Sequence, residues 1–110
     1  MFEHIFGDAQ QIQSIVDGCL KEISRRYPPS MATGEGRRLS PQAVTNILES
    51  VIGKVVTQSQ ELRLGWMGKA KLANDLKWAL NEKGYPEKFI DMFIEAVIVY
   101  VTRGPDFQRG

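Results

Sequence analysis

The sequence has a single cysteine, Cys19, and a single histidine, His4, which are candidates for the nucleophile and the base of nucleophilic catalysis. Such catalysis requires a nucleophile within hydrogen-bond reach of a base that a third group orients. Cys19 lies in the middle of an apolar stripe with helical spacing, where a thiol is packed and inert. His4 precedes the first helix-start signal, and nothing in the spacing brings it to Cys19. The sequence therefore predicts no catalytic residue and no enzymatic activity.

Acidic side chains recur at every fourth position near the C-terminus, at Glu87, Asp91 and Glu95, which places them on one face of a helix. Metal sites in helical bundles need such carboxylates from several helices, usually with a Glu-x-x-His pair. The sequence has no Glu-x-x-His pair and no glycine-rich phosphate-binding motif. We therefore predict no metal and no cofactor, and interpret the acidic strip as a solvated face or as a salt-bridging contact with a partner.

One segment, residues 34–41, has side chains that suit an anion. Arg37 and Arg38 lie just before a helix-start signal at Ser40, and a helix N-terminus offers free N–H groups and a positive partial charge. The segment is therefore a candidate anion site in which both arginines take part. The alternative is a mobile, polar connection whose two arginines only keep it soluble.

The most informative surface is predicted on residues 62–84, which carry five basic and two acidic side chains. Trp78 falls on the side of this helix opposite its apolar residues, so we expect it to point away from the core. An outward tryptophan suits a protein contact, because tryptophan is enriched among the residues that dominate binding. Alternatively, another element covers Trp78 and makes it part of a second core. The side chains that share its face, and that we predict to bind the partner with it, are Lys71, Asn74 and Asn81.

A second interpretation of the same segment is nucleic-acid binding. In that case Trp66 or Trp78 stacks on a base, and the phosphates are contacted by Arg37, Arg38, Lys69, Lys71 and Lys77. Otherwise we expect Trp66, which lies between two glycines, to be a turn residue that plugs one end of the domain. The net charge of the whole chain is only +1, which favours neither nucleic acid nor a membrane surface.

The elements that must position these residues are helices. The chain has 110 residues, of which 43% are hydrophobic and 25% charged, as is typical of one globular domain with one core. Apolar residues at intervals of three and four predict a single all-α, bundle-like domain over residues 1–110. We predict a flexible connection at 28–39, a flexible tail at 103–110, and four helices at about 9–26, 41–63, 69–83 and 86–102.

Local signals set the expected ends of these helices. Asp8 is a candidate N-cap for the first helix, and Pro28 ends that helix because proline pushes the preceding residue out of the α region. Ser40 can cap the second helix, with Pro41 in the first helical position, where its missing N–H costs nothing. Gly84 is a typical stop for the third helix. These boundaries depend only on neighbouring residues.

The fourth predicted helix is more apolar than a small domain requires. Its apolar side chains cover more than half of the circumference and leave only a narrow polar strip. A helix of this kind is either central in its own domain, packed beneath the other three helices, or shared with another subunit. We predict the second arrangement, a homodimer whose interface uses Phe89, Phe93, Val97 and Tyr100.

Together these features predict a non-catalytic helical interaction protein, an adaptor or accessory subunit that works through helix-face contacts with a protein partner and with itself. Nucleic-acid binding by the basic residues is the alternative. The N-terminus has no basic segment followed by a long apolar run, and the longest apolar stretch covers only residues 96–101. We therefore expect a cytoplasmic protein without a membrane span.

Overall fold

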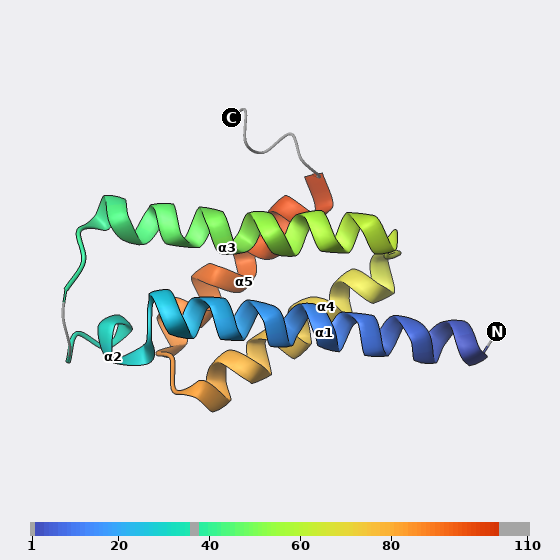
Figure 1. Ribbon diagram of the computed structural model, residues 1–110, viewed down its shortest axis with the longest axis horizontal. Coiled ribbons are helices and arrows are strands. Elements are labelled where there is room, and N and C mark those ends of the chain that lie inside the picture. Colours follow the sequence, from blue (N-terminus) through green and yellow to red (C-terminus); the bar gives the residue numbers. More distant parts are fainter. Residues whose placement is uncertain (1, 36–37, 104–110) are drawn as a thin grey trace.

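The structure of the protein is a computed structural model that describes the backbone of residues 2–35 and 38–103 and the side chains of residues 9–35 and 38–103. Throughout these residues the regular elements are helices, which confirms the all-α prediction. Figure 1 shows α1 (Phe2–Arg26), α2 (Pro29–Ala32), α3 (Pro41–Leu62), α4 (Trp66–Lys83) and α5 (Glu87–Arg103).

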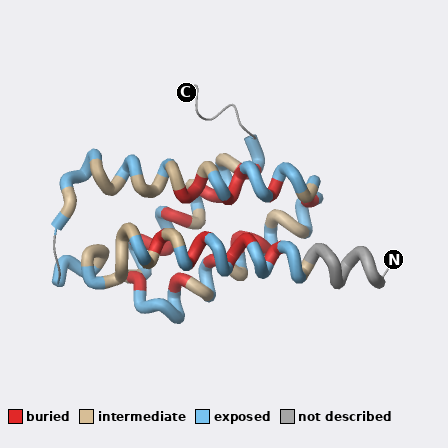
Figure 2. The backbone as a smooth tube through the Cα atoms, in the orientation of Figure 1, coloured by how far each residue is buried: buried red, intermediate tan, exposed pale blue. Residues whose placement is uncertain are grey.

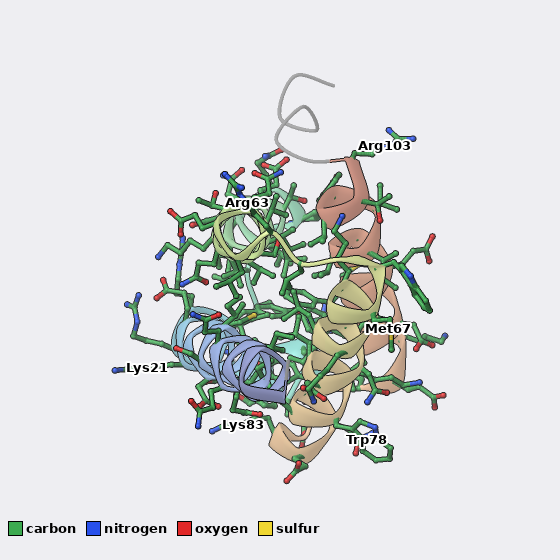
Figure 3. All side chains as sticks on the ribbon, turned by 90° about the vertical axis from the view of Figure 1, so that its right-hand side faces the viewer. Lys21, Arg63, Met67, Trp78, Lys83 and Arg103 are labelled. Atoms are coloured by element: carbon green, nitrogen blue, oxygen red, sulfur yellow. The ribbon has the colours of Figure 1, made fainter. Side chains whose placement is uncertain are left out.

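The four long helices form two layers, one of α1 and α3 and the other of α4 and α5 (Figure 3). The helices within each layer run in opposite directions (Figure 1). Between the layers, α1 contacts α4 and α3 contacts α5. Each long helix therefore packs against two others. The predicted bundle is matched only loosely, because α4 and α5 cross α1 and α3 obliquely (Figure 1).

Two helix ends follow the local signals closely. The hydroxyl oxygen of Ser40 accepts a hydrogen bond from the Ala43 N–H at 3.1 Å and so caps α3. Gly84 ends α4 with a φ of 97°, a left-handed conformation that favours glycine. The N–H of the following Tyr85 then donates to the Leu80 carbonyl at 3.2 Å. This stop turns the chain back so that α5 can pack beside α4.

Other helix boundaries differ from the prediction. The first helix starts at Phe2, so Asp8 lies inside it and is not its cap. The helix predicted from residue 69 starts at Trp66, because the extended residue Gly65 already accepts a hydrogen bond from the Lys69 N–H at 2.9 Å. The prediction that Trp66 is a turn residue plugging one end is therefore wrong. Part of the predicted connection at 28–39 forms the single-turn helix α2.

The core fills the space between the two layers. Buried positions gather where α1, α3, α4 and α5 approach one another, whereas the first half of α3 extends past them (Figure 2). At the centre Phe93 is 0% exposed. Its ring lies 5.9 Å from that of Phe89, which in turn lies 5.1 Å from Tyr85 and 5.5 Å from Tyr27. An aromatic cluster thus joins α5 to the ends of α1 and α4.

The residues predicted to form a self-interface are largely inside this core. Phe89, Phe93 and Val97 are buried by the chain's own α3 and α4, so the prediction that they contact a second subunit is wrong. Tyr100 is half-buried. The physical reason is that α5 packs against two helices at once and therefore needs apolar residues over two adjoining faces. The alternative of a helix packed centrally in its own domain explains most of its apolar surface.

Replacing Tyr85 with phenylalanine is expected to lower the free energy of unfolding by about 1 kcal/mol. The buried Tyr85 hydroxyl donates to the Tyr27 carbonyl oxygen at 2.7 Å, and the substitution leaves that carbonyl without this donor. Urea denaturation of the full chain measures the difference. Tyr27→Phe is the matched control, since the Tyr27 hydroxyl has no hydrogen bond to any described residue. Equal losses in the two variants would contradict the assignment.

Candidate interaction surface

The one cysteine of the chain is not exposed for nucleophilic chemistry. Cys19 is buried between helices, and burial raises the pKa of its thiol to about 12, so the sulfur stays protonated and unreactive near neutral pH. The side chain of His4 lies outside the part of the chain whose side chains are described. Among the described residues no three carboxylate, thiol or imidazole groups come together in a way that could hold a metal ion.

Large apolar side chains are instead exposed on α4. Trp66 is 79% exposed, Met67 69% and Trp78 60%. Figure 3 shows Met67 and Trp78 on the side of α4 that faces away from α1 and α3. The outward direction predicted for Trp78 is therefore confirmed, and the alternative of a second core over it finds no support among the described residues. A helix that exposes this much apolar surface is typical of a binding site.

The neighbouring helix α5 continues this surface. Ile98 is 49% exposed and lies on the same side of α5 as its acidic strip, because the residues are spaced by three and four. Met92 and Val99 are exposed beside this strip. We use the term outer face for a set of exposed residues on the two helices, Trp66, Met67, Ala70, Asn74, Lys77, Trp78 and Asn81 of α4 and Glu87, Asp91, Glu95, Ile98 and Thr102 of α5.

A groove of about 410 Å³ runs between the first half of α4 and the last half of α5. Its walls are mostly apolar, and Lys69 and Thr102 supply the polar atoms at its rim. The groove exists because α4 has the small residues Ala70 and Ala73 where it faces α5. Its lining consists of Trp66, Lys69, Ala70, Ala73, Val97, Ile98, Val101 and Thr102. The groove offers space for an apolar side chain of a partner.

The charges of the outer face are divided between its two helices. The exposed residues of α4 on this face include Lys77 and no acid, whereas those of α5 include three acids, with the exposed Lys88 at their edge. Neither Lys77 nor any of the three acids takes part in an ion pair with another described residue. Lys71, at the edge of the face, is bound to Asp75 at 3.0 Å. The free charges are therefore available to a partner.

The predicted partner-binding residues lie together on this surface. Asn74, Trp78 and Asn81 are exposed and belong to the outer face, and Lys71 lies beside them with its ammonium group held by Asp75. Sequence reasoning missed Met67, Ala70 and Ile98. Met67 precedes Trp78 by eleven residues, which is three helical turns. This spacing would have identified it had the start of α4 been placed at Trp66.

The structure does not gather the predicted anion-binding residues. Arg37 lies outside the described residues, and Arg38 is exposed in the connection that precedes α3. Trp66 and Lys69 are at the start of α4, at the opposite end of the molecule from that connection (Figure 1). At the α3 N-terminus, moreover, one backbone N–H is already satisfied by Ser40.

A cluster of charges between α1 and α3 also escaped the sequence analysis. The Glu22 carboxylate lies 2.9 Å from Arg25, 3.6 Å from Arg26 and 3.8 Å from Lys54. The hydrogen bond from Arg25, followed by the other nearby cations, holds the pKa of Glu22 below its usual range. Spacing along α1 indicates the two arginine contacts, but Lys54 comes from α3 and meets Glu22 only through packing. The cluster links two helices and has a structural role.

Comparison with known proteins gives no further guide to function. The chain matches no protein-family model, and neither curated proteins nor solved structures yielded a match. Over the described residues, no helix combines the length and the apolar character needed to cross a bilayer.

Proposed function

We propose that the protein is a non-catalytic helical interaction protein, an adaptor or accessory subunit that binds protein partners, a copy of itself included, through the outer face. The observation that carries this proposal is the exposure of Trp66, Met67 and Trp78 on one helix. Tryptophan and other large apolar side chains dominate the energy of protein interfaces when they are enclosed. The groove beside Trp66 adds a concave site for an apolar anchor.

The charge distribution supports a protein partner over nucleic acid. Lys77, a cation of the outer face, has the three acids of α5 on the neighbouring helix. A polyanion that reached Lys77 would also meet these carboxylates, and they would repel it. Arg38, another candidate phosphate contact, lies at the far end of α3 from Trp66. These features favour a contact that uses both signs of charge.

The experiment compares the assemblies formed by the wild-type chain and by the variant Trp66→Ala/Trp78→Ala, using sedimentation velocity on the purified chain alone and with proteins that co-purify with it. We expect the variant to bind at least about tenfold more weakly, because tryptophans in an enclosed contact contribute most of the binding energy. Circular dichroism should be unchanged, since both side chains are exposed. Gln58→Ala, on exposed α3 surface, is the control and should assemble like wild type.

Two results would overturn the proposal. One is a double variant that forms the same assemblies as the wild type. The other is low-salt binding of single- or double-stranded nucleic acid, lost steeply as salt rises, with no protein assembly at all. The chain's two tryptophans both belong to the outer face. A blue shift of tryptophan emission on assembly would therefore report burial of this surface and of no other.

A further inference from the structure

We infer that the partner of the outer face is a second copy of this chain, with α4 of one copy lying on α5 of the other about a two-fold axis that runs along these helices. The inference rests on the proposed function, because it takes the outer face as a protein-binding surface. It goes further by stating which partner fits and in which orientation.

The two helices of the outer face are in register with each other. Ala70 of α4 and Ile98 of α5 line the same groove, and the helices run in opposite directions (Figure 1). All α-helices rise by the same distance per residue. Residues that lie equally many positions after Ala70 in α4 and before Ile98 in α5 therefore lie at the same height, by which we mean the position along the helix axes. Lys77, seven residues after Ala70, is therefore level with Asp91, seven residues before Ile98. The same count places Asn81 level with Glu87, Trp66 with Thr102, and Asn74 within one residue of Glu95.

Across these levels the two helices are chemically complementary. The α4 residues Asn74, Lys77 and Asn81 are hydrogen-bond donors through their amide or ammonium groups. The α5 residues at the matching heights are the carboxylates of Glu95, Asp91 and Glu87, which accept hydrogen bonds. Within the described chain these carboxylates have no ion-pair partner. A surface that carried α4 of another copy would supply one donor to each of them.

Charge also selects between the two possible symmetric dimers. A two-fold axis in the plane of the outer face can run across the helices or along them. An axis across the helices places α5 on α5 of the other copy, so that acids face acids. An axis along the helices keeps every residue at its own height and places α4 on α5 of the other copy. The second arrangement brings Lys77 to Asp91 twice, because a two-fold interface repeats each contact.

The apolar part of the outer face fits the same arrangement. The axis follows the groove between α4 and α5, so the grooves of the two copies face each other. Trp66 of one copy then lies over Thr102 and close to Ile98 of the other. Burial of these side chains, 79% and 49% exposed in the single chain, removes apolar surface from water and supplies affinity. The charges mainly set the orientation.

The test is a charge exchange measured by sedimentation equilibrium on the full chain. One variant, Asp91→Lys/Glu95→Lys, makes both helices of the outer face basic, and the other, Asn74→Asp/Lys77→Glu, makes both acidic. We expect each variant alone to dimerise at least about tenfold more weakly at low salt, since residues 77 and 91 then carry like charges at both copies of their contact. An equimolar mixture of the two should recover a dimer as tight as wild type, because acid meets base at both contacts.

Two control variants and a measurement at high salt test whether the charges of the outer face cause the effect. Lys21→Glu on α1 and Glu49→Lys on α3 also reverse a charge, one in each direction, but lie on the other layer, and they should dimerise like wild type. In about 1 M salt, where charges are screened beyond ~3 Å, the difference between variants should largely disappear. The inference is overturned if the chain stays monomeric, or if the mixture fails to recover the dimer. The proposed function would survive either outcome if Trp66→Ala/Trp78→Ala still loses another protein partner.

Discussion

Replacing Phe93 with alanine is expected to lower the free energy of unfolding by about 3–5 kcal/mol, the range found for phenylalanine removed from a packed core. Phe93 is 0% exposed, and its ring lies 5.9 Å from Phe89 in the aromatic cluster. Since α5 packs on both α3 and α4, the cavity would weaken both contacts. A loss of this size is a large part of the stability of a small domain.

Urea denaturation followed by circular dichroism measures this loss. The matched control is Met92→Ala at the adjacent position, where the side chain is exposed, and we expect a change within about 0.5 kcal/mol. The comparison also tests whether Phe93 lies in the core of the single chain or in a contact between two subunits. If Phe93 instead contacted a second subunit, Phe93→Ala would yield a stable folded monomer. Similar small changes in both variants would contradict the structure.

The second large effect expected is a loss of stability at alkaline pH through Cys19. Burial raises the pKa of this thiol from 9.0 to about 12 in the folded chain. The neutral thiol is thus favoured by folding, and the unfolded chain releases its proton first as the pH rises. The stability that depends on the neutral thiol is complete below pH 9.0 and falls progressively between pH 9.0 and about 12. Burial also raises the pKa of Tyr85 above its usual value of 10.0, which adds to the decline.

The Cys19→Ala variant isolates the contribution of the thiol. It removes the titrating group, so the free energy of unfolding should decline less steeply above pH 9.0 than in the wild type, even if the variant is less stable at neutral pH. Urea denaturation from pH 7 to 11 measures both slopes. At neutral pH a thiol reagent should modify wild-type Cys19 only after unfolding. Identical slopes, or rapid modification of the folded chain, would contradict the burial of this residue.

The sequence by itself determined the features that depend on near neighbours. The intervals of three and four between apolar residues predicted an all-α chain, because such spacing places them on one side of a helix. Ser40 and Gly84 predicted the start of α3 and the end of α4, since a cap or a left-handed glycine acts within a few residues. The outward direction of Trp78 followed in the same way from its position opposite the apolar residues of its helix.

Only the tertiary structure decided what the apolar surface of α5 is for. The spacing of the apolar residues along α5 is the same whether they pack against α3, α4 or another subunit. The sequence therefore could not assign Phe89, Phe93 and Val97 to the chain's own core. Likewise, Trp66 and Ile98 are far apart along the chain and share a groove only because α4 and α5 pack in antiparallel register. Contacts of this kind depend on how helices meet, and local spacing carries no information about that.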